Sequence, residues 1–283
     1  VALGAALVLS AGAPVRAQNA EVPFTPPTDA RVDAAIRRGL AGLLGSQNED
    51  GTWDGAYRIS FPGGVESLVI WTALQAGEKP ARPALRKAVR YIDSVEPYTV
   101  YARAARALAY AALGPAHAKT LQRDVDWLVR HQVRPAGGWG YGPGHRTTQK
   151  HPARTDTSNT SWALRALEAA DQAGARVIVS VRRDARRYWR RIQNDDGGWG
   201  YEPNVGSVAP FRPESYGSMT AVGTAALARL LRRASDDNPA ARAGGARAVA
   251  RGLTWLDGHF ALDQNPAWAW GTPRTYLYTY YLG

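Results

Sequence analysis

The sequence predicts an all-α protein built from repeated helical hairpins, and three observations lead to this prediction. A turn with the order Gln, short polar segment, Gly and Trp occurs more than once along the 283 residues. Apolar residues spaced i, i+3 and i+4 precede each copy, as on the buried face of a helix. A helix rich in small residues follows each copy after a variable loop. Each repeat therefore contributes one outer and one inner helix.

The chain begins with residues that precede the repeats. Residues 1–17 are an apolar run ending in small residues, which is typical of a secretory signal cleaved after Ala17. Neither Met nor a basic segment precedes the run, so we expect the chain to be clipped at its start. We interpret residues 18–30 as a linker and residues 31–283 as the repeat domain. We expect an exported bacterial protein, periplasmic or extracellular, without a transmembrane span because the run is too short.

The predicted outer helices are amphipathic. They are expected at segments ending with residues 40–47, at 82–93, at 119–131, at segments ending with 185–193, and at 242–257. In the Arg-rich segment 182–191, arginines recur at i+4, while Val181, Ala185, Tyr188 and Ile192 form the buried side.

The predicted inner helices are apolar or small nearly all round, which indicates burial on several sides. They are expected at 65–77, 101–114, 158–174 and 217–231, with a last one starting near Thr275.

The repeated turn, here called the Gln–Trp turn, joins each outer helix to a loop. Its copies run from Gln47 to Trp53, from Gln132 to Trp139 and from Gln193 to Trp199. Degenerate copies place Glu96 and Phe260 at the Gln position. Helix ends leave backbone carbonyl and N–H groups unpaired, and a Gln amide can donate to one set and accept from the other. We expect the Trp ring to shield these hydrogen bonds from water.

The acids of this turn are interpreted as turn residues and not as a catalytic pair. Asp195 and Asp196 precede the glycines of the third copy, but the middle copy has Arg134 and Pro135 at these positions. Catalytic acids should be unique, whereas Asp in a turn accepts hydrogen bonds from nearby backbone and Gly supplies positive φ.

These turns, with DTSNTSWALRALEAA and GSMTAVGTAAL, resemble the squalene and oxidosqualene cyclases and the wider group that includes protein prenyltransferase β subunits. The two segments are especially similar to exported bacterial repeat proteins of unassigned activity. The resemblance covers residues 32–283 and implies an α/α toroid closed by the repeated Gln-to-Trp motif. About five hairpins of a six-hairpin ring are present, so we expect the chain to be clipped at its C-terminus too. The motif specifies fold more strongly than reaction.

Two departures separate the chain from the chemistry of those families. Squalene-type cyclases use an Asp in an Asp-x-Asp-Asp motif, whereas the nearest string here is DVDW, at Asp124 to Trp127 on an outer helix. Protein prenyltransferases hold zinc with Asp, Cys and His, and this chain has no Cys. Neither chemistry transfers to any position, and we expect no cofactor and no metal.

The formal charge of +11 comes mainly from arginine, since only four of the 35 Lys and Arg residues are lysine. We interpret the densest run, residues 182–191, as a solvated helix face, with an anionic polymer or a membrane surface as the alternative. We expect no nucleic-acid partner. The absence of Cys also excludes disulfides and thiolate nucleophiles.

The toroid implies a site where the loops after each Trp gather at one mouth of the lumen, called the mouth below. These loops are polar and aromatic, and inner-helix N-termini add partial positive charge that favours anions. Tyrosine with Arg and Asn also suits sugar faces and hydroxyls, although loops often look this way without a ligand. The candidate ligand-binding residues are Tyr57, Arg58, Tyr141, Arg154, Asn159, Tyr201, Arg212, Tyr216 and Trp270.

Four residues are weak catalytic candidates: Glu66, Asp156, His145 and Glu214. Glu66 can instead stabilise a helix N-terminus, and Asp156 can instead cap one. His145 with His151 and Asp156 could bind a metal, but their spacing matches no helical i, i+4 pair.

The preferred function is a binding or scaffold protein that holds a small-molecule or polysaccharide ligand at the mouth. The alternatives are a terpenoid cyclase with a non-standard acid, or a lyase or hydrolase acting on acidic polysaccharide. A cyclase needs a deep apolar cavity lined by aromatic rings, and a polysaccharide enzyme needs an open cleft with a base near Arg. A scaffold would have a shallow mouth and a packed lumen.

Overall fold

A computed structural model of the chain describes residues 28–55, 58–143, 145, 149–150, 154–202, 214–232, 239–269 and 271–282. The predicted signal peptide and most of the predicted linker lie outside these residues. The first helix begins at Asp29, where the Thr28 hydroxyl accepts a hydrogen bond from the N–H of Arg31 (3.4 Å). Within the described ranges, no helix has both the length and the apolar character needed to cross a membrane.

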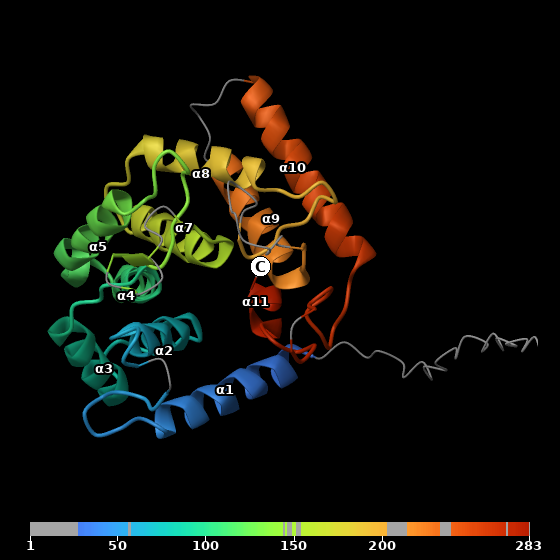
Figure 1. The fold of residues 1–283 in the computed structure, drawn as a ribbon. Coiled ribbons are helices and arrows are strands. Elements are labelled where there is room, and N and C mark those ends of the chain that lie inside the picture. Colours follow the sequence, from blue (N-terminus) through green and yellow to red (C-terminus); the bar gives the residue numbers. More distant parts are fainter. Residues whose placement is uncertain are drawn as a thin grey trace, which may run out of the picture.

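The described residues form helices joined by turns and loops, arranged as outer and inner members of successive hairpins (Figure 1). The outer helices are α1 (Asp29–Gly45), α3 (Pro83–Ser94), α5 (Ala118–Arg130), α8 (Val179–Arg191) and α10 (Pro239–Gly258). The inner helices are α2 (Gly64–Gln75), α4 (Val100–Leu113), α7 (Thr157–Gln172), α9 (Gly217–Arg232) and α11 (Leu277–Leu282). A short 3₁₀ helix, η1 (Pro115–His117), leads into α5.

The inner helices pack against one another in chain order, from α2 through α4, α7 and α9 to α11. The outer helices lie around them, and Figure 1 looks along the axis of this arrangement. The predicted all-α toroid of hairpins is therefore confirmed.

Burial follows the two predicted patterns. In α4 every residue from Ala102 to Tyr110 is buried, because this helix is packed between α2, α7 and α5. Small residues permit close packing in other inner helices too. In α9, a Cβ on Gly223 would lie only 2.8 Å from the Trp199 ring. Outer helix α8 buries Val181, Ala185 and Tyr188 on one side and exposes arginines on the other.

Each Gln of a Gln–Trp turn links its own turn to the next outer helix. The side-chain Nε2 donates to the carbonyl of the turn glycine and to a carbonyl of the following outer helix. The bonds run from Gln47 to Gly51 (3.1 Å) and Ala84 (2.9 Å), from Gln132 to Gly137 (2.9 Å) and Val181 (3.0 Å), and from Gln193 to Gly197 (2.8 Å) and Ala248 (2.8 Å). The amide thus donates twice, which differs from the expected pairing of one donation with one acceptance. For Gln132, the buried Oε1 makes no hydrogen bond within the described residues.

The Trp of each turn bonds back to the outer helix that precedes it. Its indole Nε1 donates to a carbonyl near the end of that helix. The acceptors are Leu43 for Trp53 (2.7 Å), Leu128 for Trp139 (2.8 Å) and Trp189 for Trp199 (3.0 Å). Trp139 and Trp199 have no exposed surface, so these bonds are made out of reach of water.

The turn glycines have a conformational and a steric reason to be glycine. Gly137 has φ +91°, and a Cβ there would lie 2.4 Å from the Asp184 carbonyl of α8. Gly51 and Gly197 have the same φ sign and approach α3 and α10 in the same way. Each turn is therefore pressed directly against the next outer helix.

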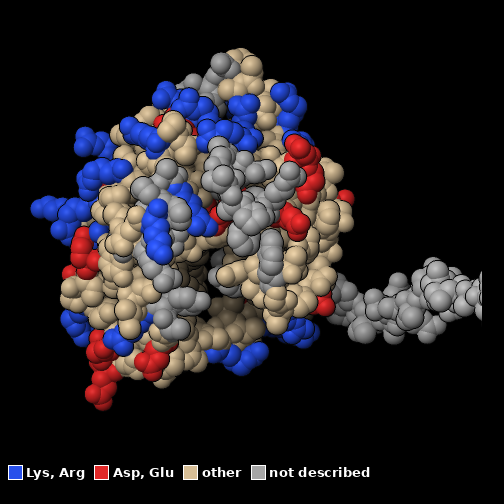
Figure 2. All heavy atoms as spheres, in the orientation of Figure 1, with Lys and Arg blue, Asp and Glu red and all other residues tan. Residues whose placement is uncertain are grey.

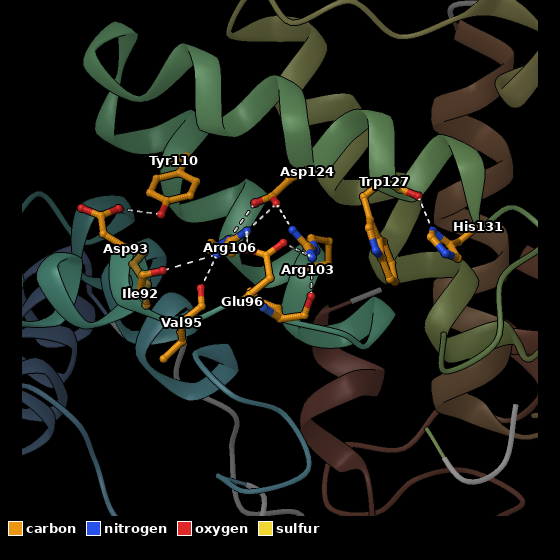
Figure 3. Close-up of polar contacts among 11 residues, drawn as sticks. Ile92, Asp93, Val95, Glu96, Arg103, Arg106, Tyr110, Asp124, Trp127 and His131 are labelled. Atoms are coloured by element: carbon orange, nitrogen blue, oxygen red, sulfur yellow. Dashed lines mark hydrogen bonds and ion pairs between the residues drawn. The ribbon is translucent and has the colours of Figure 1, made fainter. Parts of the chain in front are cut away.

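The second hairpin has a charged connection where the Gln–Trp turn is degenerate (Figure 3). Asp124 of α5 accepts hydrogen bonds from Arg103 (2.8 Å) and from Arg106 (2.7 and 2.9 Å) of α4. The same arginines pair with Glu96, and Arg106 also donates to the Val95 carbonyl (2.7 Å). Guanidinium groups thus hold the turn carbonyls here, and Asp124 supplies the link to the next outer helix.

Candidate functional site at the mouth

Backbone hydrogen bonds join consecutive repeats at the N-termini of the inner helices, where the sequence predicts the mouth. The first N–H of an inner helix donates to a loop carbonyl of the following repeat. The bonds run from Val100 to Tyr141 (2.9 Å), from Thr157 to Tyr201 (2.9 Å) and from Gly217 to Pro266 (2.7 Å). Tyr141 and Tyr201 each lie two residues after the Trp of their turn, so the same two features position both side chains.

The two tyrosine side chains meet at the mouth. Their hydroxyl oxygens lie 2.8 Å apart, so one phenol donates to the other. Burial raises the pKa of both phenols, which keeps them protonated. Both side chains are half-buried, so part of their surface is exposed.

Aromatic rings extend the pair along the mouth. His145 is stacked on Tyr141 with ring centroids 4.2 Å apart, and Tyr101 meets Tyr141 edge to face at 5.7 Å. Phe61 lies edge to face with Tyr101 at 5.7 Å. We call Phe61, Tyr101, Tyr141, His145 and Tyr201 the aromatic wall. The members are half-buried, so the wall presents ring surface as well as hydroxyl groups.

Asp156 caps α7 beside this wall. Its Oδ1 accepts from the backbone N–H of Asn159 (2.7 Å) and its Oδ2 from the Asn159 side chain (2.8 Å). Burial raises the pKa of Asp156 to about 7, opposed by the Asn159 hydrogen bonds. The Oδ1 of Asn159 is buried and makes no hydrogen bond within the described residues. The negative charge of Asp156 also contributes to the raised pKa of Tyr201 and Tyr216.

Several other candidates surround Asp156. Arg154 forms an ion pair with Glu202, and both charges influence Asp156. Tyr216 is buried, with its ring edge to face on Trp268 at 5.0 Å. Glu214 is exposed just before α9. Asn159 therefore contacts the buried Asp156 directly, whereas Arg154 and the three tyrosines Tyr141, Tyr201 and Tyr216 interact with it electrostatically.

Glu66 and Arg58 serve the first Gln–Trp turn instead. Glu66 is buried in the first turn of α2, and its Oε1 accepts from the N–H of Trp53 (3.5 Å). Thr160 accepts in the same way from Trp139 (2.9 Å) in the second turn, so Glu66 occupies a repeated structural position. Arg58 forms an ion pair with Asp50 (3.1 Å). Burial raises the pKa of Glu66.

Four of the predicted residues lie outside the described part of the chain: Tyr57, His151, Arg212 and Trp270. Among the residues that are described, no group of three His, Asp or Glu side chains gathers closely enough to hold a metal ion.

The inner-helix N-termini are occupied by the chain itself. Thr99 accepts from the N–H of Ala102 (3.4 Å), Asp156 from Asn159, and Asn265 from Ser218 (2.7 Å). Together with the bonds between repeats, these caps use the leading N–H groups of α4, α7 and α9. Few backbone N–H donors therefore remain at these N-termini to bind an anion, which weakens the attraction that we expected.

A cavity that the sequence did not indicate lies between α7 and α9, with Thr279 of α11 on its border. Leucine and alanine line much of it, but Arg165, Glu168 and Arg229 place charges there. Arg229 approaches Glu168 at 3.9 Å, and the Arg165 guanidinium lies 6.0 Å from the Trp71 ring of α2. Burial lowers the pKa of Arg165, and the like charge of Arg229 adds to this. This cavity is amphipathic and not a purely apolar chamber. Figure 2 has the orientation of Figure 1 and shows that this face of the molecule is hollowed near its centre.

Comparison with solved structures supports the same architecture. The chain is similar to an ent-copalyl diphosphate synthase from Streptomyces platensis, with a TM-score of 0.54 and 17% identity over 84% of this chain. The fold is terpenoid cyclase-like. The chain spans 41% of the length of that synthase. No family model and no curated protein matches the sequence.

The terpenoid cyclase-like fold does not place an acid of the cyclase type at the DVDW string. Asp124 has no exposed surface and is enclosed by Arg103 and Arg106 in the charged connection of Figure 3. Both of its carboxylate oxygens are engaged by these guanidinium groups, so the side chain is not free to contact a substrate. Arg103 and Arg106 were not predicted to have a role. Two arginines at i and i+3 in an otherwise alanine-rich inner helix were the available signal.

Proposed function

We propose that this chain is a ligand-binding toroid whose mouth holds a carbohydrate against the aromatic wall. The observation that carries the proposal is the hydroxyl pair of Tyr141 and Tyr201, whose oxygens lie 2.8 Å apart. The Tyr201 carbonyl accepts a hydrogen bond from the N–H of Thr157, which directly follows the buried Asp156 in the chain. Sugar rings present apolar C–H faces and many hydroxyls. Aromatic faces next to phenol, amide and carboxylate groups complement both features.

The proposal includes export, because the signal-like residues 1–17 would direct the chain to where polysaccharides are found. Fractionation of a producing bacterium should place the protein in the periplasm or the medium. Recovery only from the cytoplasm would remove this part of the proposal.

The binding test replaces the two phenols singly and together by Phe. Titration of cellohexaose, followed by intrinsic Trp fluorescence or calorimetry, should give binding that each substitution weakens about 2- to 12-fold, since each removes a hydrogen bond of about 0.5–1.5 kcal/mol. Tyr91→Phe on outer helix α3 is the matched control and should bind as the wild type does.

Equal binding by the wild type and the double Phe variant would place the ligand elsewhere. No binding of cellohexaose or of a chitin oligosaccharide would reject the carbohydrate itself.

A terpenoid cyclase remains the second candidate, because one observation favours it. The pKa of Asp156 is raised to about 7, so a fraction of this acid is protonated at neutral pH, as a proton donor must be. Against it, both Asp156 oxygens accept hydrogen bonds from Asn159, and charged groups enter the cavity. Incubation with linear polyprenyl substrates and mass spectrometry would reveal cyclised product, lost in Asp156→Asn.

A further inference from the structure

Arginines from two outer helices line one groove on the outside of the ring. The groove lies between α8 and α10, and its basic residues are Arg187, Arg190, Arg191, Arg247 and Arg251. All five are exposed. Figure 2 shows Lys and Arg gathered over the region where Figure 1 places α8 and α10.

The groove is held in shape by contacts to neutral groups. Arg191 donates to the Ala136 carbonyl (2.9 Å), and Arg251 donates to the carbonyls of Asn194 (2.8 Å) and Asp195 (2.7 Å). These bonds fix the two guanidinium groups against the Gln–Trp turns without neutralising their charge. Each guanidinium keeps further N–H donors that a ligand can use.

Glycine makes room for a third guanidinium. A Cβ on Gly244 of α10 would lie 2.4 Å from Nη2 of Arg190, so this arginine lies directly against the neighbouring helix. A larger residue at position 244 would push it out of the groove. The two walls of the groove therefore carry positioned arginines and not only mobile ones.

Acids near the groove compensate only part of its charge. Asp184 is the single acid within α8 and pairs with Arg187 (2.6 Å), while the single acid within α10 is Asp257, near its end. Asp196 accepts from the Trp255 indole (3.0 Å) and from the N–H of Gly198 (2.9 Å), so its side chain is engaged in the turn. Asp195 is exposed at the edge. Electrostatic attraction for an anionic partner therefore remains.

We propose that the groove between α8 and α10 binds a linear acidic polysaccharide, through its repeated carboxylate or sulfate groups. The guanidinium fork matches either oxyanion with two parallel hydrogen bonds. The other lining residues are Gln193, Gly244 and Ala248, so the described part of the groove offers no aromatic ring on which a nucleobase would stack. Among the described lining residues there is also no large apolar side chain to insert into a membrane. This site is separate from the aromatic wall and does not depend on the function proposed for the mouth.

The experiment compares two double charge reversals with equal effect on net charge. Arg190→Glu with Arg247→Glu changes the groove, and Arg86→Glu with Arg90→Glu changes exposed residues of α3 on another outer helix. Polygalacturonate and dextran sulfate, with their fluorescently labelled fragments, are titrated at several salt concentrations. We expect the groove variant to lose at least tenfold in affinity and to show a flatter salt dependence, and the α3 variant to lose less than threefold.

Other outcomes overturn the proposal. Equal weakening in both variants would show a response to net charge alone. Preferential, groove-dependent binding of a single-stranded DNA oligonucleotide, or of vesicles with anionic phospholipid, would assign the groove to another partner. No binding of either acidic polysaccharide at low salt would reject it. The mouth variants Tyr141→Phe and Tyr201→Phe should leave this binding unchanged, which separates failure of one site from failure of the other.

Discussion

Asp156 shows how one residue at the mouth couples local structure to pH. It caps α7 through Asn159, yet burial raises its pKa to about 7. In an unfolded chain the pKa of Asp is about 3.9, so the folded state binds this proton more tightly. The resulting stabilisation is fully present below about pH 4 and is lost as the pH rises toward 7.

Asp156→Asn should therefore alter the pH dependence of stability more than the fold. Asn caps a helix about as well as Asp but carries no titrating charge. From pH 4 to pH 8, we expect the free energy of unfolding of the wild type to fall relative to that of the variant, by at most about 4 kcal/mol. Chemical denaturation at each pH measures this difference, in which the titration of other groups cancels. Parallel curves for the two proteins would contradict the raised pKa.

At the scale of helices, the turns are held by different chemistry in different repeats. Three turns use a Gln amide that donates to two carbonyls, whereas the turn after α3 uses Arg103 and Arg106 with Asp124 of α5. The common result is a bond from each turn to the next outer helix. Removing a partner from the charged connection should cost more stability than removing one from a Gln–Trp turn, because it leaves a buried charge uncompensated.

Asp124→Asn and Glu96→Gln test this connection as a matched pair. Asp124 has no exposed side-chain surface, while Glu96 is 73% exposed, and both pair with the same two arginines. We expect Asp124→Asn to destabilise the protein by about 3–5 kcal/mol and Glu96→Gln by less than about 1 kcal/mol. Thermal or denaturant unfolding measures both. Similar small losses in the two variants would show that α4 and α5 are held mainly by apolar packing.

For the whole molecule, the repeated pattern was sufficient to predict the order of outer and inner helices. The i, i+3, i+4 spacing on one side of α8 and the small residues throughout α9 required no tertiary information. Tyr141 and Tyr201 were candidates for the mouth because they stand in the polar, aromatic loops that follow the Trp of their turns. That their hydroxyls meet depends on how consecutive repeats are rotated around the ring, which a single sequence does not encode locally.

Contacts between distant segments explain the rest of what the sequence did not reveal. Asp124 was noticed only as part of an acid string, since its partners lie 18 and 21 residues away on another helix. Glu66 was weighed as a catalytic acid, and only its repeat position opposite the Trp53 N–H shows its structural contact. Arg165 and Arg229 both line the cavity between α7 and α9. Helical spacing pairs residues three or four apart and therefore could not predict that these two lie close together. The groove of arginines also required two outer helices to be neighbours.

Hydrogen exchange with bound ligand tests most directly the claim that the toroid binds carbohydrate at its mouth. Saturation with cellohexaose should slow exchange in residues 139–143, 154–160 and 199–202, and leave α8 and α10 unchanged. Slowed exchange confined to the outer helices, or spread evenly over the chain, would contradict a site at the mouth.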